Sequence, residues 1–217
     1  MASESRNPHG ARIDQTMKHI LAPLLLAVLV GCTGRALNSD GSPVGPPVDT
    51  GSEAIHFVVP EGSRIGFQAY RPGIQIMEYV PENQSVEHWT DMLTVLIMAR
   101  DTAPDIDAFF QRMTNTFHSG CTVEPIVEAP TRFLDGHYQA GIQTAICGKS
   151  KQFGTGTVVV YKMIQGAHGF YQVQRAWNFP PVARSLDIPL TKAMRDSAAG
   201  RLALVHLCDR QNPGQQC

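Results

Sequence analysis

Residues 92–120 read MLTVLIMARDTAPDIDAFFQRMTNTFHSG, and this stretch decides the fold class. Met92–Met98 is apolar at both alternating sets of positions, which predicts a central strand buried on both faces. Asp101-Thr102-Ala103-Pro104 then supplies a capping residue and an early proline for a helix, which Gly120 ends. Between them a single apolar stripe has helical spacing at Ile106, Phe109, Phe110, Met113 and Phe117. A buried strand and an amphipathic helix therefore form the centre of the domain.

Short strands joined by tight turns lie on both sides of this stretch. We predict them over residues 55–59, 66–70, 74–80, 126–133, 137–147, 157–164 and 170–177. A second helix is expected from about Leu190 to Cys208. Consecutive strands joined by tight turns pair antiparallel, so we predict an α+β fold: a single domain with an antiparallel sheet of about six to seven strands and two helices packed against it.

The composition sets outer limits on the function. The 217 residues are 43% hydrophobic and 17% charged, which is enough for one ordinary domain and argues against wholesale disorder. The formal net charge is −1, whereas a dedicated nucleic-acid binder usually has a strongly basic balance. We therefore expect no nucleic-acid partner.

An apolar run near the start of the chain has the form of an export signal. Residues 20–30 (ILAPLLLAVLV) follow Lys18 and carry no charge. As a helix the run would reach about 16 Å, too short for a hydrocarbon core of about 30 Å but right for a secretory signal. It ends in Leu29-Val30-Gly31-Cys32. A buried helix of a cytosolic domain is the alternative, and the Gly- and Pro-rich stretch that follows disfavours it.

This arrangement resembles a bacterial lipoprotein precursor, in which Leu, a small or β-branched residue, Gly and Cys form the lipobox. The resemblance implies that Cys32 is diacylated, that the signal is removed before it, and that the new amino group is acylated. Thr33, where inner-membrane members have Asp, implies anchoring in the outer membrane with the domain in the periplasm, rather than in the inner membrane or at the cell surface. Met17-Lys18-His19 is a better start than Met1, so residues 1–16 are expected to be an upstream extension.

The rest of the chain divides into a tether, a domain and a tail. We predict residues 1–31 as extension and signal peptide, and 32–53 as the lipidated Cys with a Gly/Pro/Ser-rich tether. Residues 54–208 would form the globular domain and 209–217 a disulfide-tied tail. The element order and the run Trp89-Thr90-Asp91-Met92-Leu93-Thr94, where a strand begins, resemble the PsbP-type fold. That resemblance implies a non-catalytic binding module and identifies no functional residues.

The chain has five cysteines, and lipidation of Cys32 leaves four. An exported chain meets an oxidising compartment, where thiols pair. Of the three possible connectivities we favour Cys121–Cys147 and Cys208–Cys217, each contributing about 2–4 kcal/mol. The alternative is a thiol active site in which His118 activates Cys121.

Other candidate chemistry is weaker. No CxxC or HExxH motif is present, so we predict no metal site, and we expect no cofactor. Acidic side chains could serve a cell-wall-glycan hydrolase, although a solvated surface is commoner: Glu78, Glu82, Glu87 and Asp91. Aromatic residues could form a binding surface, although core packing is commoner: Trp89, Trp177 and Phe179.

Charge is unevenly distributed along the chain. Cys32 to Thr131 holds 5 basic and 13 acidic residues, whereas Arg132 to Cys217 holds 10 basic and 4 acidic. Either the halves interleave in one sheet and neutralise each other, or a bipolar surface steers a charged partner. The sequence thus predicts a lipid-anchored envelope protein that binds another macromolecule in assembly, secretion or immunity, without catalysis. The alternative is an envelope enzyme acting on cell-wall glycans.

Overall fold

The computed structural model describes residues 48–211 except residue 102. Its helices are α2 (Ile106–Gly120) and α3 (Lys192–Ala203). The strands are β1 (Glu53–His56), β2 (Ser63–Arg71), β3 (Ile74–Pro81), β4 (Asp91–Ala99), β5 (Ile126–Val127), β6 (Thr131–Asp135), β7 (Tyr138–Cys147), β8 (Gly156–Gln165), β9 (Gly169–Phe179) and β10 (His206–Asp209). The fold is a single α+β domain.

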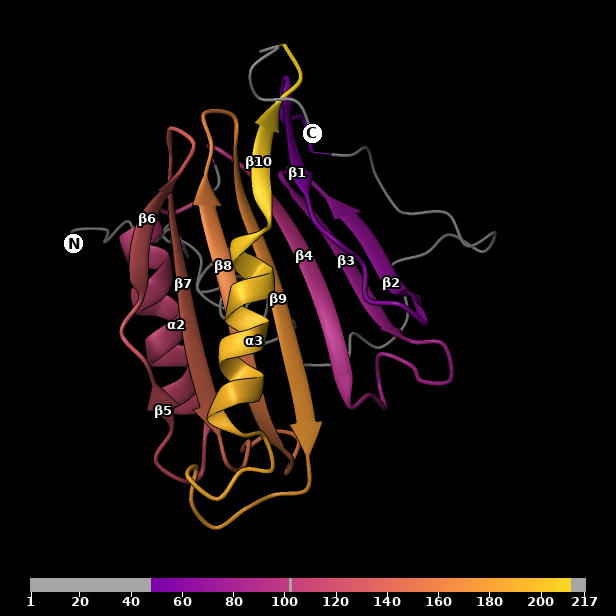
Figure 1. Ribbon diagram of the computed structural model, residues 1–217, viewed down its shortest axis with the longest axis vertical. Helices are drawn as coiled ribbons and strands as arrows, with labels where there is room; N and C mark the ends of the chain where they lie inside the picture. The colour runs from indigo at the N-terminus through magenta and orange to yellow at the C-terminus, as the bar shows by residue number, and fades with distance from the viewer. Residues whose placement is uncertain (1–47, 102, 212–217) are drawn as a thin grey trace, which may run out of the picture.

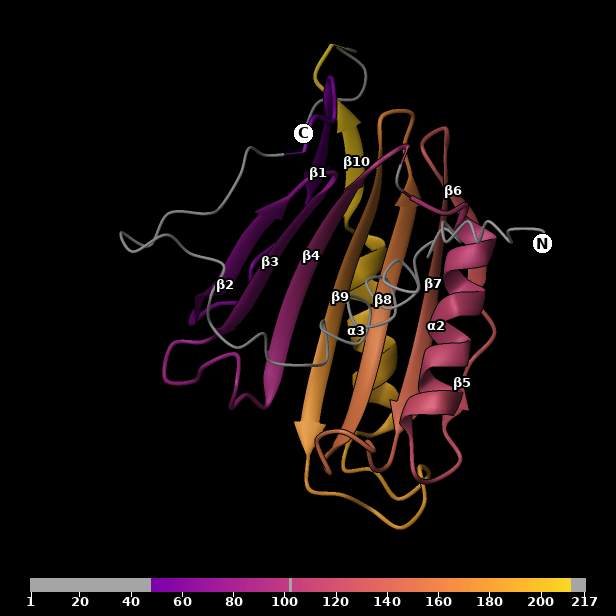
Figure 2. The ribbon, with the colours of Figure 1, turned by 180° about the vertical axis from the view of Figure 1, so that it is seen from behind.

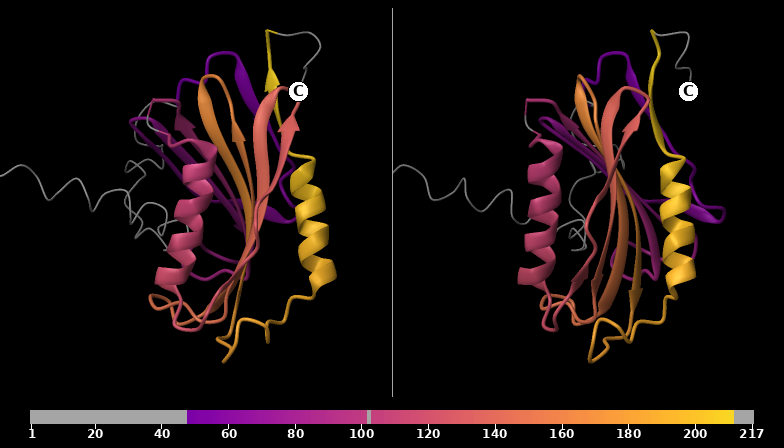
Figure 3. Two further views of the ribbon diagram at one scale, coloured as in Figure 1. Left: turned by 90° about the vertical axis from the view of Figure 1, so that its left-hand side faces the viewer. Right: turned by 60° about the vertical axis from the view of Figure 1, so that its left-hand side comes forward.

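Eight strands form one antiparallel sheet that separates the two helices (Figures 1 and 3). Its order is β2-β3-β4-β9-β8-β7-β5, and β6 also pairs with β7. Helix α2 lies on one side, here called the α2 face, and α3 lies on the other, the α3 face (Figure 3). Strands β1 and β10 pair separately, with Ala54 opposite Cys208. Each face therefore has its own hydrophobic core.

The strand count is larger than the sequence predicts: ten strands in two sheets instead of about six to seven in one. One reason is that the single strand expected over 126–133 is two, β5 and β6, with Pro130 between them. Another is that α3 ends at Ala203 instead of continuing to Cys208. Residues 206–209 form β10 instead, which pairs with β1.

The apolar stripe of α2 is buried as predicted, but the helix begins later than expected. Its cap is Asp105, whose carboxylate accepts a hydrogen bond from the Ala108 backbone N–H at 2.8 Å. A proline disfavours helical backbone at the residue before it, so the helix starts only after Pro104. The ring of Phe109 stacks on Phe170 of β9 with centroids 5.0 Å apart, which fixes α2 against the sheet.

The two charge halves of the chain do not alternate in the sheet. Strands β2, β3 and β4 lie together, and β9, β8 and β7 follow on the other side of the β4–β9 pair (Figure 2). Ion pairs nevertheless join the halves, including Asp91 with Arg175 at 2.6 Å and Asp107 with Arg132. Strands β2 to β4 themselves carry two arginines and two acids, so most of the acidic excess of residues 32–131 lies outside these strands.

Candidate binding groove on the α3 face

A groove runs along the α3 face between the C-terminal half of α3 and the segment that follows β1. Its volume is about 490 Å³, within the range of small-molecule and peptide-anchor pockets. Ten of its thirteen lining residues are apolar, and the three charged ones are Glu61, Arg175 and Arg201. Residues 57–61 form one wall, α3 and the turn after it form the other, and Leu93 and Val173 of the sheet form the floor.

Both walls of the groove expose large apolar side chains to solvent. In α3, Ala198 and Leu202 are buried against the sheet, while Leu204, the C-cap, is 74% exposed. Across the groove Val58 is 78% exposed. Large apolar side chains on both rims of an apolar groove are typical of a docking surface. Leu204 still has αR backbone and follows the buried Leu202 by two residues, so it lies away from the buried stripe.

Two arginines give the groove its charge. Arg175 donates two hydrogen bonds to Asp91, at 2.9 and 2.6 Å, and its guanidinium lies 5.3 Å from the centroid of the Trp177 ring. This geometry holds it rigidly at the floor. Arg201 is exposed on α3, where its guanidinium lies 3.5 Å from the Ser197 hydroxyl. Arg201 is therefore available to an acidic group of a ligand.

A buried lysine fixes the α3 wall. Lys162 of β8 is 1% exposed and lies 2.7 Å from the Asp135 carboxylate. Its ammonium also donates to the backbone carbonyl of Val205 and, at 3.2 Å, to that of Ala203. It thereby satisfies carbonyls at the end of α3, which have no partner within the helix. The groove wall is consequently tied to the centre of the sheet.

A buried carboxylate fixes the opposite wall. Glu53 of β1 is 2% exposed and accepts hydrogen bonds from the backbone of Ala167 and His168 and from the Tyr171 hydroxyl, at 2.6, 3.1 and 2.9 Å. Burial, with the charge of Glu53 as a smaller cause, raises the pKa of Tyr171. Strand β1 is therefore anchored to the β8–β9 turn, and the segment after it leaves from a fixed point.

The predicted aromatic surface is divided between separate clusters. Trp89 is 8% exposed and belongs to the core under α2. Trp177 and Phe179 pack in a different cluster, with Ile146, Val158 and Leu190. Trp177 is not part of the groove lining, and its ring lies 5.3 Å from the guanidinium of Arg175, which is. No sequence pattern marked the groove residues. The apolar run that begins at Phe57 looks like a buried strand, and only the exposure of its side chains shows that it is a groove wall.

The four candidate carboxylates are not brought together either. Glu78 points to the α2 face and Asp91 to the α3 face, where it is paired with Arg175. Glu82 and Glu87 are exposed in the loop between β3 and β4. Glycan hydrolysis needs two carboxyls about 5–9 Å apart across a cleft, so this quartet does not form such a pair.

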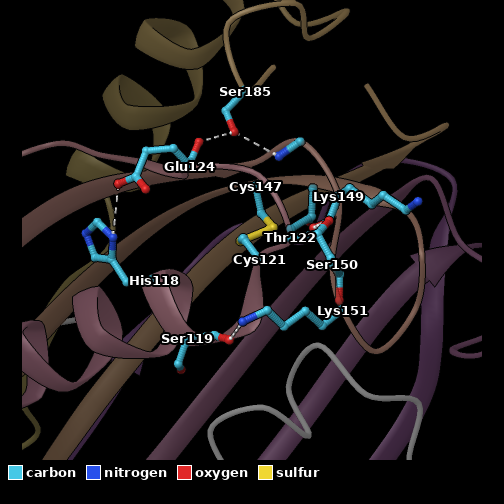
Figure 4. The surroundings of a disulfide bond; sticks show 12 residues. His118, Ser119, Cys121, Thr122, Glu124, Cys147, Lys149, Ser150, Lys151 and Ser185 are labelled. Carbon is cyan, nitrogen blue, oxygen red and sulfur yellow. Dashed lines mark hydrogen bonds and ion pairs between the residues drawn. A yellow bond between two sulfur atoms is a disulfide. The ribbon is translucent and has the colours of Figure 1, made fainter. Parts of the chain in front are cut away.

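The disulfide Cys121–Cys147 is present and is the pairing that the sequence analysis favours (Figure 4). It joins the end of α2 to the end of β7 across a Cα–Cα distance of 5.8 Å. His118 points away from it, with Nδ1 3.4 Å from the Glu124 carboxylate (Figure 4). Because its thiol is bonded, Cys121 is not the nucleophile of the alternative hypothesis.

The other cysteine predictions reach beyond the described residues. Cys208 is disulfide-bonded, while Cys32 and Cys217 lie outside residues 48–211. The Cys208–Cys217 pairing and lipidation of Cys32 stay predictions. Among the residues that the structure describes, no three His, Cys, Asp or Glu side chains are grouped as metal ligands. No helix in this part of the chain has the length and apolarity to cross a membrane.

Comparisons with known proteins give little guidance. No family model matches the chain, and no curated protein matches it. Among solved structures, the Ran-binding protein Mog1p of Saccharomyces cerevisiae has a TM-score of 0.38 at 15% identity, covering 68% of this chain and 78% of Mog1p. LpqN, involved in cell envelope biogenesis of Mycobacterium tuberculosis, has a TM-score of 0.35 at 14% identity, covering 73% of this chain and 86% of LpqN. These are Mog1 and LpqN rather than PsbP proteins, and likenesses this weak carry no function.

Proposed function

We propose that the protein is a bacterial outer-membrane lipoprotein, anchored through Cys32, whose periplasmic α+β domain is a non-catalytic binding module. Its partner is another envelope protein that inserts an apolar segment into the groove on the α3 face. The observation that carries the proposal is the groove itself: an apolar cleft of about 490 Å³ with Leu204 and Val58 exposed on opposite rims. Apolar anchors that fill such clefts provide most of the binding energy in protein interfaces.

The position of the groove suits a tethered protein. Val48, the first described residue, packs against the same cluster as Phe57 and Leu202. The tether therefore joins the domain on the α3 face, close to the groove. A tether of about 20 residues spans at most about 70 Å when extended, which keeps the groove within reach of membrane-bound partners.

Charge defines the partner further. Arg201 is exposed at the groove wall, and Arg175 lies at its floor with Asp91 as partner. An apolar segment with an acidic side chain next to its anchor would complement this arrangement. Asp91 neutralises Arg175, so Arg201 is the residue that selects for the acid.

Three charge variants test the groove. A photo-crosslinker at Val59, 37% exposed on the 57–61 wall, would trap the partner in intact cells. Leu204→Asp and Arg201→Glu should each abolish the crosslinked product, whereas Leu186→Asp, at an equally exposed site outside the groove, should not. Equal crosslinking in all three variants would contradict docking in the groove.

The anchor is tested separately. Cys32→Ser should abolish acyl labelling and release the protein from the membrane fraction, because two or three acyl chains hold a protein stably where one does not. Unchanged fractionation would contradict the lipoprotein proposal and leave the groove proposal standing. The two experiments therefore fail independently.

A further inference from the structure

A row of polar side chains crosses the α2 face of the sheet, in the middle of an otherwise apolar core. Its members are paired in register strand by strand and are all 5% exposed or less: Glu78, Thr94, Gln174, Tyr161 and Gln143. We call this the polar row. It runs from β3, one strand from the edge of the sheet, through β4, β9 and β8 to β7. Buried polar side chains are normally hydrogen-bonded, so each member of the row should have a partner.

The end of the polar row on β7 is closed. The Tyr161 hydroxyl donates to Oε1 of Gln143. The Gln143 amide donates in turn to the Glu128 backbone carbonyl at 2.8 Å and lies 3.4 Å from the Thr114 hydroxyl of α2. A backbone carbonyl therefore terminates this half of the row, and α2 covers it (Figure 2).

The end on β3 is open. The Gln172 amide donates to Gln174 at 2.6 Å, and the Gln174 amide is 3.5 Å from the Thr94 hydroxyl. The donors thus run in sequence toward Glu78, which is opposite Thr94. Within the described part of the chain, Glu78 makes no hydrogen bond or ion pair, and Oε1 of Gln172 has no partner.

The surroundings of Glu78 are apolar and uncovered by helix. Phe67 of β2 is its register partner on the edge side, and Ile76 and Val80 flank it along β3 on the same face. Helix α2 packs over β7 and β8, and none of the described helices lies over β3 on this face (Figure 2). Strands β2 to β4 carry two arginines and two acids, so Glu78 lies among strands that are balanced in charge.

We propose that the Glu78 end of the polar row is a binding site for a primary ammonium group carried on a short apolar chain. The ammonium would donate hydrogen bonds to the Glu78 carboxylate, and its chain would lie against Phe67, Ile76 and Leu96. A neutral hydroxyl can also donate, but only a cation offsets the burial of an ionised carboxylate.

Binding at this site should release a proton from Glu78. Burial raises the pKa of Glu78 from 4.5 to about 8, so the free protein holds this carboxyl protonated at pH 7. Its register neighbours Phe67 and Thr94 do not titrate, and burial keeps Tyr161, the next titratable member of the row, protonated. An ammonium would ionise Glu78 on binding, and the carboxyl proton would pass to the buffer while the ligand keeps its own.

The test is calorimetry on the purified full chain with n-hexylammonium chloride at pH 7, in two buffers of different ionisation enthalpy. We expect saturable binding with release of close to one proton per protein. Glu78→Gln, which mimics the protonated side chain and should fold normally, should weaken binding by at least about tenfold. Glu82→Gln, at an exposed carboxyl four residues along the chain, should bind like the wild type.

Three outcomes would overturn the proposal: no saturable binding of hexylammonium, equal binding of n-hexanol, or unaltered binding to Glu78→Gln. Equal binding of n-hexanol without proton release would identify the site as one for neutral alcohols instead. Leu204→Asp, on the opposite face, should leave hexylammonium binding unchanged, so failure here is distinguishable from failure of the groove proposal.

Discussion

The two faces of the sheet differ in how a buried charged side chain of the sheet is partnered. Lys162, under α3, has a carboxylate at 2.7 Å and two backbone carbonyls as partners. Glu78, on the α2 face, is nearly as buried but has no partner among the described residues, and burial alone raises its pKa to about 8. Burial without a partner destabilises a charge. Lys162, which has partners, therefore stabilises the fold, whereas Glu78 is free to interact with a ligand.

The largest expected effect comes from removing Lys162, the buried charge that has partners. Lys162→Met should lower the free energy of unfolding by about 3–5 kcal/mol, because it leaves the Asp135 carboxylate, 12% exposed, without its cation. Urea denaturation measures the loss. The double variant Lys162→Met/Asp135→Leu should recover most of it, and a double variant as unstable as the single one would contradict a paired role for Lys162.

The next largest effect is the pH dependence of stability that Glu78, the buried carboxyl without a partner, should cause. The pKa of Glu78 is raised in the folded state, so the folded protein binds more protons than the unfolded chain between about pH 4.5 and 8. Glu78 should therefore make stability fall as pH rises through this window, by at most about 1.4 kcal/mol per pH unit. Thermal unfolding of wild type and Glu78→Gln should converge near pH 5 and diverge by pH 8, with the variant more stable. Parallel profiles would show that Glu78 ionises normally.

A smaller effect is expected at the closed end of the polar row. Tyr161→Phe removes the donor to Gln143 and should cost about 1–3 kcal/mol, because the buried amide oxygen loses its partner. Chemical denaturation at pH 7 measures this change. Tyr171→Phe, which removes one of three donors to Glu53, is the matched control and should cost less.

The smallest effect is expected at the open end. Gln172→Met replaces a buried amide whose oxygen is unpaired with an apolar side chain of similar length. The lost hydrogen bond to Gln174 and the removed unpaired acceptor offset each other, so stability should change by less than about 1 kcal/mol. A loss as large as that of Tyr161→Phe would show that both ends of the row are structural.

Local patterns predicted most of the fold correctly. The helical stripe of α2, the strands β4, β7, β8 and β9 and the turn at Gly136 between β6 and β7 all follow from spacing and turn residues. The misjudged boundaries lie where tertiary pairing competes with local preference. The helical spacing extends to Cys208, yet residues 206–209 pair with β1, at least 150 residues earlier in the chain.

The candidate sites were less predictable than the fold. Glu78 was singled out as one of four acids near in sequence, but adjacent acids in a chain can point to opposite faces, as Glu78 and Asp91 do. Trp89, Trp177 and Phe179 were candidates for a binding surface, with core packing the commoner role of such residues, and Trp89 and Phe179 are buried. No sequence signal marked Val58 or Leu204, whose exposure depends on how the segments after β1 and α3 leave the sheet.

The sequence by itself determined the alternation of apolar residues and the fold class, because both follow from spacing along the chain. It favoured the Cys121–Cys147 pairing among three connectivities, and the structure decided that pairing. Only the tertiary structure decided which charges have partners. Lys162 and Glu78 are each the one charged residue of a largely apolar strand, and the sequence gives no reason to distinguish them. Partner atoms come from distant segments, Asp135 and Val205 for the lysine, so their presence depends on how strands and helices meet in space.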